Sequence, residues 1–209
     1  MDYHKIYDAS RTPELNRLQP ATYVLMDTLV APGSRELLDA LDVLMQLSTM
    51  AAAFRPGAPD SYRGDLYPLE GVWKVAQADP EREFEEGMVG KIMMRQPDAL
   101  TAAQFEEYKH TLSARSNETQ QTYLGSARLV TIDEGLCAQI RHIGPYNDEP
   151  ASFAIVEQFL RDQHLRRTTP TLHREIYLID TRTAQPAAFE TILRVQVEAA
   201  TPNRSGVQQ

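Results

Sequence analysis

Two segments, PLEGVWKV at residues 68–75 and HREIYLID at residues 173–180, decide the fold of this 209-residue chain. Each is short and rich in β-branched, aliphatic or aromatic residues, which is typical of a β-strand. When the two segments are aligned, Glu70 in the first corresponds to Glu175 in the second. This correspondence suggests an internal repeat, although the two copies share little identity.

The first half of the chain surrounds PLEGVWKV with a simple order of elements. TYVLMDTLV at residues 22–30 has the composition of a strand and is followed by a Pro-Gly breaker. Ser34 is a suitable helix N-cap, and apolar residues at helical spacing continue to about Phe54. VGKIMMRQ at residues 89–96 is expected to form the next strand. The first half is therefore predicted to be strand, helix, strand and strand.

The second half repeats this order. Residues 126–143 predict a strand, an Asp-Glu-Gly turn and another strand, and residues 152–165 predict a helix with one apolar face. HREIYLID and then FETILRVQVE at residues 189–198 follow as two strands. Between the halves, residues 98–116 predict an amphipathic helix that joins them.

These patterns predict an α+β fold in which two pseudo-symmetric strand–helix–strand–strand modules form one curved antiparallel sheet. We expect helices packed on the sheet and a central ligand cleft between the modules, near the pseudo-two-fold axis. The expected boundaries are an N-terminal arm (1–20), a single domain (21–198) with a first module (21–97), a linker helix (98–117) and a second module (124–198), and a flexible tail (199–209).

The composition argues against several classes of function. The formal net charge is −8, and acidic and basic residues are interspersed, so the basic stripe that neutralises nucleic-acid phosphates is missing. No stretch approaches the roughly 20 apolar residues that span a bilayer, and the first residues have no apolar run of a secretory signal. The single cysteine, Cys137, implies no oxidising compartment. We expect a cytoplasmic protein that binds neither nucleic acid nor membrane.

Glu175 lies inside a predicted strand, where a carboxylate faces either solvent or a cavity. Because side chains alternate along a strand, His173 and Tyr177 share its face. On a wet face, Glu175 would be an ordinary surface residue. In a partly buried position, it would need a proton, a cation or a water molecule as a partner, which would suit a binding site. The pattern alone leaves both alternatives open.

Three further residues present similar alternatives. Glu70 faces the same choice as Glu175. Trp73, the only tryptophan, is either a core residue or a flat wall for an aromatic ligand, since an indole offers a large stacking area. Tyr146, which follows a Gly-Pro pair, is either a turn residue with a solvated hydroxyl or a residue whose hydroxyl points into the cleft.

The sequence shows no metal-binding or nucleophile motif. None of its five histidines has a ligand spacing such as HxxxH or HExxH, so we expect no metal and no cofactor. His142 and His173 could still meet in space. Cys137 has apolar neighbours and is expected to be buried and inert. Methionines such as Met94 are expected to fill the core or to soften a pocket.

Six segments, taken in order, resemble the successive signatures of the GyrI-like small-molecule-binding superfamily, and more narrowly its stand-alone members that have no DNA-binding segment. The segments are PLEGVW, IMMRQP, EEYK, DEGLCAQIRHIGPYNDEP, HREIYLID and TILRVQV. The similarity runs from about Thr22 to Val197 and covers most of the chain. The long GLCAQIRHIGPY segment, together with LEGVW and HREIYL, gives the similarity its specificity.

The resemblance implies two modules with a ligand cleft between them, and it implies that the glutamate of the EIYL segment, Glu175, lies in that cleft. In a stand-alone branch similar to this chain, members hydrolyse cyclopropanoid alkylating agents of the duocarmycin and yatakemycin kind. The implied activity is cofactor-independent addition of water to the cyclopropane, for self-protection or detoxification. The expected catalytic residues are Glu175, Tyr146 and Tyr177, and the expected ligand-binding residues are Trp73, Glu70, His142, His173 and Met94.

Two departures from the family pattern leave the ligand open. Lys74 follows Trp73 where a second aromatic residue can stand in relatives, and the acidic connection at residues 78–90 is longer than expected. The alternative function is non-catalytic sensing or sequestering of amphipathic cationic compounds, with Glu175 as counter-charge. Regulatory binding to a protein, as one relative binds DNA gyrase, ranks last. The expected partner is a hydrophobic aromatic small molecule, and we expect a monomer or a homodimer.

Overall fold

The computed structural model describes residues 6–30, 35–52, 66–74, 88–180 and 182–200. Several predicted features therefore lie outside the described residues. They are the first five residues of the N-terminal arm, the helix cap Ser34, the expected helix end near Phe54, most of the acidic connection at 78–90, and all but the first two residues of the tail.

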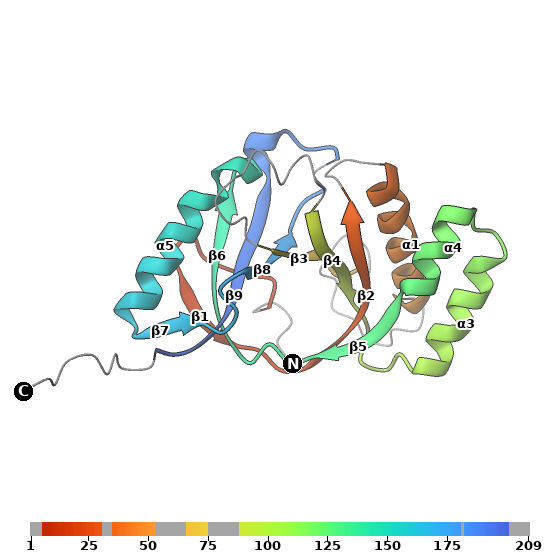
Figure 1. Cartoon of the computed structure of the whole chain (residues 1–209), viewed down its shortest axis with the longest axis horizontal. Coiled ribbons are helices and arrows are strands. Elements are labelled where there is room, and N and C mark those ends of the chain that lie inside the picture. Colours follow the sequence, from red (N-terminus) through yellow and green to blue (C-terminus); the bar gives the residue numbers. More distant parts are fainter. Residues whose placement is uncertain (1–5, 31–34, 53–65, 75–87, 181, 201–209) are drawn as a thin grey trace, which may run out of the picture.

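The described strands form one antiparallel sheet, and helices pack on it (Figure 1). Eight strands follow the order β1-β6-β9-β8-β3-β4-β2-β5, and β7 pairs with β9. The strands are β1 (Glu14–Arg17), β2 (Ala21–Val30), β3 (Leu69–Lys74), β4 (Met88–Arg95), β5 (Arg128–Ile132), β6 (Leu136–Ile143), β7 (Leu165–Arg167), β8 (Leu172–Tyr177) and β9 (Glu190–Ala199). The helices are α1 (Arg35–Ala52), α3 (Ala102–Ser113), α4 (Glu118–Ser126) and α5 (Glu149–Asp162), with the short 3-10 helices η2 (Tyr146–Asp148) and η3 (Pro186–Ala188).

The strand order confirms the predicted α+β fold of two modules. In the first module, β2, α1, β3 and β4 follow one another, and β4 lies between β2 and β3 in the sheet. In the second module, β6, α5, β8 and β9 have the same arrangement, with β9 between β6 and β8. The innermost strands, β3 and β8, lie side by side at the centre of the sheet. Each module also gains an edge strand, because β5 pairs with β2 and β1 pairs with β6.

The curvature of the sheet follows from two short connections. Residues 18–20 alone join β1, at one edge of the sheet, to β2 near the other edge. Residues 133–135 alone join the opposite edge strand, β5, to β6. Since neither connection can span a flat sheet of eight strands, the sheet must curve until its edges approach one another.

α1 and α5 pack on the same face of the sheet, at its two ends. A row of successive cross-strand partners shows this: Met26, Ile92, Gly71, Glu175, Leu193 and Ile140. Cross-strand partners project from the same face. The Met26 end of the row packs against α1, and the Ile140 end packs against α5. Each aliphatic side chain buried in these contacts contributes about 1.5–3 kcal/mol. Glu175 therefore lies between the two packed ends.

Two helices occupy the region between the modules, where the sequence predicts one linker helix at 98–117. α3 begins at a capping box formed by Thr101 and Gln104, and α4 begins at a second capping box formed by Asn117 and Gln120. Each box satisfies two backbone N–H groups at the helix start. The second box starts a new helix that packs beside α1, which extends the helical layer of the first module.

The opposite face of the sheet is covered by the N-terminal segment. Ile6 and Tyr7 are buried there against Ile176 and Ile192. β1 continues this segment along β6. The residues predicted as an arm thus supply part of a core on this face, and the face bearing α1 and α5 is left for a functional site.

Candidate functional site

Four predicted site residues share the face that carries α1 and α5. Trp73 is the cross-strand partner of His173, and Glu175 is the partner of Gly71. Tyr177 follows Glu175 by two residues and so projects from the same face. The strand alternation expected from the sequence holds for His173, Glu175 and Tyr177, and the pairing of β3 with β8 places Trp73 beside them.

Glu175 is buried and accepts hydrogen bonds at both of its oxygens. The residue is 7% exposed, Oε1 lies 2.7 Å from His173 Nε2, and Oε2 accepts from the Tyr177 hydroxyl at 2.8 Å. Trp73 Nε1 donates in turn to the Tyr177 oxygen at 2.8 Å. Burial and the charge of Glu175 raise the pKa of Tyr177 well above its usual value, so its hydroxyl remains a donor.

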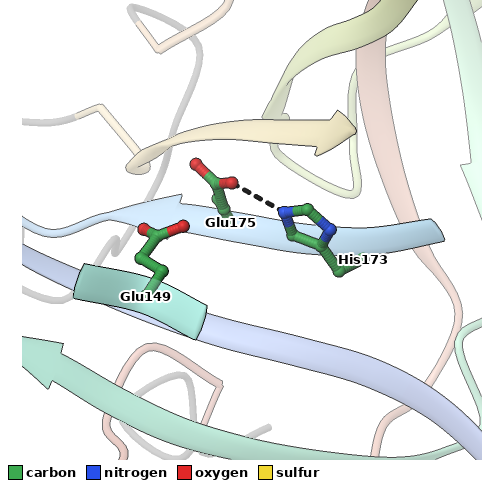
Figure 2. A group of neighbouring side chains, drawn as sticks. All are labelled: Glu149, His173 and Glu175. Carbon is green, nitrogen blue, oxygen red and sulfur yellow. Dashed lines mark hydrogen bonds and ion pairs between the residues drawn. The ribbon is translucent and has the colours of Figure 1, made fainter. Parts of the chain in front are cut away.

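Glu149, the first residue of α5, supplies a second carboxyl group to the site. Figure 2 shows it beside Glu175 and His173, which both come from β8. Glu149 is 6% exposed, and its pKa is raised to about 9, first by burial and then by the charge of Glu175 and a hydrogen bond to it. Near neutral pH, Glu149 therefore holds a proton beside the negative charge of Glu175. The two carboxyl groups form a coupled pair that shares its protons.

Sequence reasoning missed Glu149. An acidic residue in the first turn of a helix is common, because it interacts favourably with the helix dipole. Only the tertiary packing of α5 against the sheet brings Glu149 to Glu175, so no local signal could have identified it.

The Trp73 indole lies flat against the backbone of two strands. A Cβ atom placed on Gly71 would lie 2.4 Å from Trp73 Nε1, and one placed on Gly90 would lie 2.2 Å from Trp73 Cε3. Both distances are far below a van der Waals contact, so only glycine permits this ring position. The other face of the indole points away from the sheet, toward the side on which α1 and α5 lie. Trp73 is 7% exposed and belongs to the core cluster beneath α1, and its Nε1 edge reaches Tyr177.

Further aromatic rings surround the carboxyl pair. Tyr146 packs edge-on against Tyr177, with ring centroids 6.0 Å apart, and it also contacts Phe189 at 5.3 Å. Tyr146 is 39% exposed and is therefore the outermost of these rings. Phe153, from α5, packs edge-on against His173 at 4.8 Å. The site combines one net negative charge with an aromatic surround, which suits flat hydrophobic ligands.

His142 and Met94 lie at the margins of this site. His142 Nδ1 is 2.9 Å from Ser152 Oγ in α5, and its Nε2 is 3.2 Å from the Pro145 carbonyl oxygen. These contacts hold the turn that carries Tyr146 and the first turn of α5. Met94 is 1% exposed and packs in the core beneath α1. Neither side chain is brought to Glu175 by a contact in the structure.

Glu70 lies on the opposite face from Glu175. Its cross-strand partner is Ile176, one residue past Glu175, and this offset turns the Glu70 side chain toward the N-terminal segment. There Glu70 is fully buried and accepts hydrogen bonds from the Tyr7 hydroxyl and from Arg174 Nη1, both at 2.9 Å. Burial raises the pKa of Glu70, and the Arg174 charge opposes that rise. The structure therefore separates the two glutamates that the sequence alignment made equivalent.

The donor set of the site could also hold a metal ion. Within the described residues, Glu149, His173 and Glu175 each offer a ligand atom, and the three atoms lie within 4.8 Å of one another. Two carboxylates and an imidazole can bind Zn²⁺ or Mn²⁺. Yet Glu175 already accepts hydrogen bonds from His173 and Tyr177, and a metal would have to displace them. A proton, which burial already favours on Glu149, fits the group without rearrangement, so we assign a proton to this position.

The chain matches the family described as a GyrI-like small molecule binding domain over residues 71–197. It therefore belongs to the GyrI-like family, which confirms the resemblance found in the sequence. No curated protein matches the chain. Within the described residues, no helix has both the length and the apolar composition needed to cross a membrane.

Solved structures of two Listeria innocua proteins share the whole fold. A protein described as a hydrolase is 26% identical, with a TM-score of 0.81 over 94% of this chain and 97% of its own. An uncharacterized conserved protein is 28% identical, with a TM-score of 0.80 over the same shares of the two chains. The EcmrR C-terminal domain is 13% identical over 90% of this chain and 98% of its own, with a TM-score of 0.56, and shares the fold alone.

Proposed function

We propose that this protein binds planar hydrophobic small molecules beside Glu175 and hydrolyses cyclopropanoid alkylating agents of the duocarmycin and yatakemycin kind. The observation that carries the proposal is the buried pair of Glu149 and Glu175 next to the flat Trp73 indole. The similarity to a Listeria innocua hydrolase supports an enzymatic role. The reaction adds one water molecule to the cyclopropane and gives self-protection or detoxification.

The carboxyl pair suits general-base catalysis. Because Glu149 stays protonated, the pair carries one negative charge, and the Glu175 carboxylate can accept a proton from water. The water oxygen then bonds to a cyclopropane carbon as the ring C–C bond breaks. The electron pair of that bond moves to the conjugated carbonyl oxygen, which becomes a phenolate and takes up a proton. A positioned base of this kind typically accelerates a reaction about 100- to 10,000-fold.

The aromatic residues orient the ligand and its developing charge. Trp73 stacks on the flat ring system and excludes water from it. Tyr177 donates its one proton to Glu175 and so holds the carboxylate in place, whereas Tyr146, which packs against Tyr177, is the phenol that would donate to the carbonyl oxygen and stabilise the charge that forms there. Cys137 has no role as a nucleophile, because burial above all raises its pKa to about 12. A cytoplasmic location and a monomeric or homodimeric state stay predictions.

The test is turnover of a cyclopropane-bearing agent, followed by mass spectrometry of the product that has gained one water. The wild-type protein is expected to convert many equivalents, and Glu175→Gln to lose about 100- to 10,000-fold of the rate, since an amide cannot accept the proton. His110→Gln, in a helix remote from the carboxyl pair, is the matched control and should keep full turnover. Unchanged turnover in Glu175→Gln would refute the role of the carboxylate.

The second candidate function is a non-catalytic binder of amphipathic cations. It is supported by one buried negative charge with the rings of Tyr146, Phe153 and Tyr177 nearby, which can hold an organic cation by charge and cation–π contact. Stoichiometry separates the two functions. A binder protects at most one ligand per protein molecule, whereas an enzyme consumes successive additions of the agent at an undiminished rate.

A further inference from the structure

Several buried side-chain atoms of the described residues have no hydrogen-bond partner, and three of them belong to residues on the face that carries Glu175 or at the start of α5. Within the described residues, these atoms include Glu149 Oε1, His173 Nδ1 and Thr191 Oγ1. Most buried polar groups in folded proteins are paired, and an unpaired one lowers stability. This cluster of three groups offers hydrogen bonds that a water molecule or a ligand could complete.

Thr191 is the member of this cluster that the proposed chemistry does not yet use. It is fully buried in β9, where it is the cross-strand partner of His142 on one side and of Tyr177 on the other. It therefore projects from the face that bears Glu175. Along β9, the next residues on that face are Leu193 and Val195, which are apolar.

The first turn of α5 lies over this part of the sheet. Ser152 of α5 is bonded to His142, the neighbour of Thr191, and Glu149 lies one helical turn before Ser152. The Thr191 hydroxyl is thus bordered by Tyr177, by His142 and by the turn that begins with Glu149. Packing alone would be served as well by valine, which has the same shape, so the hydroxyl itself needs an explanation.

We propose that Thr191 is a binding residue of the site, whose hydroxyl hydrogen-bonds an oxygen atom next to the carboxyl pair. That oxygen belongs either to the water that reacts or to the ligand. The inference rests on the proposed function for the identity of the ligand, but the unpaired hydroxyl is a property of the fold. It predicts an uncommon combination, in which loss of the hydroxyl harms binding or turnover without harming stability.

The matched variants are Thr191→Val, which removes only the hydroxyl, and Thr191→Ser, which retains it. The midpoint of thermal unfolding of Thr191→Val is expected to be no lower than that of the wild type, because an unpaired buried group is removed. Its kcat/KM toward a cyclopropane-bearing agent should fall about ten-fold, the effect of one hydrogen bond, while Thr191→Ser stays within about two-fold of the wild type.

Whether Thr191→Val loses ligand affinity or kcat identifies the bound oxygen. If Thr191 holds the ligand, Thr191→Val weakens binding of both the agent and its ring-opened phenol, measured through the fluorescence of the single tryptophan, Trp73. If it holds the reacting water, those affinities stay constant and kcat falls. The proposal is overturned if Thr191→Val binds and reacts like the wild type, if Thr191→Ser loses as much as Thr191→Val, or if Thr191→Val unfolds at a lower temperature.

Failure of the proposed function leaves this inference testable. If the wild type binds the agent without converting it, hydrolysis is wrong, and the affinities of the two variants still decide the role of Thr191. If the wild type binds none of the agents, a crystal structure of the unliganded protein decides. An ordered water within hydrogen-bond distance of Thr191 Oγ1 supports the inference, and a hydroxyl without such a water overturns it.

Discussion

Buried acids on the two faces of the central strands have opposite kinds of partner. On the face covered by the N-terminal segment, Glu70 is paired with Arg174, and Arg174 and Arg194 both contact Glu134. On the face that bears the helices, Glu175 lies beside a second acid, Glu149. Within the described residues, neither of these two acids is paired with an arginine or a lysine, and the cationic partner of Glu175 is at most His173.

The difference teaches how one pair of strands can serve both stability and function. A buried carboxylate that meets a guanidinium stays charged and holds distant segments together, because each partner compensates the desolvation of the other. A buried acid that meets another acid keeps a proton instead. The first arrangement ties the N-terminal segment, the turn before β6 and strand β8 into one core, and the second leaves proton-transfer groups on the opposite side of β8.

The largest expected effect comes from breaking the paired network. Glu70→Gln removes one of the two carboxylates that compensate Arg174 and should lower the free energy of unfolding by up to about 3–5 kcal/mol. Glu175→Gln is the matched control on the other face and should cost far less, because Glu175 is paired with no arginine or lysine among the described residues and its loss leaves no guanidinium uncompensated. Urea unfolding of the two variants measures the contrast. Equal losses would mean that the two faces do not differ as described.

A pH titration of stability sharpens the comparison. The pKa of Glu149 is raised to about 9 in the folded state, well above the 4.5 of an ordinary glutamate. Between these values, the folded state binds a proton that the unfolded state has lost, so stability falls as pH rises. The slope is at most about 1.4 kcal/mol per pH unit, and it should flatten above the folded-state pKa.

Glu149→Gln isolates this contribution. The variant keeps the size of the side chain but cannot titrate, so its free energy of unfolding should decline less between pH 5 and pH 8 than that of the wild type. Urea unfolding at three pH values measures the difference between the two curves. Parallel curves would show that Glu149 does not hold a proton in the folded state, and that the site carries two negative charges.

Sequence patterns sufficed for the features that depend on local order. The alternation of HREIYLID put His173, Glu175 and Tyr177 on one face, and the structure agrees. The register between β3 and β8 could not be foreseen, because it depends on the pairing of segments about 100 residues apart. An offset of one residue moved Glu70 to the other face, although the repeat had aligned it with Glu175.

Glu149 and helix α4 were not predicted from the sequence, for two different reasons. Glu149 reaches the site only because α5 packs across the sheet, which no local pattern encodes. α4 was missed for a different reason, since its residues are mostly polar and only Leu124 is buried. Its capping box of Asn117 and Gln120 was visible in the sequence, and it was the one signal that could have predicted the start of this helix.

The smallest expected effect is that of a substitution beside Trp73. Gly90→Ala places a Cβ atom within 2.2 Å of the Trp73 ring and should push the indole away from the sheet. The emission spectrum of Trp73 should shift, and stacking of a planar ligand should weaken about three- to ten-fold.

Gly125→Ala is the matched control, because no atom lies within 4 Å of its added Cβ and the residue is in a helix. It should leave the emission unchanged and add about 0.5–1 kcal/mol of stability. If ligand binding by Gly90→Ala equals that of the wild type although the emission of Trp73 shifts, the indole is no part of the ligand surface.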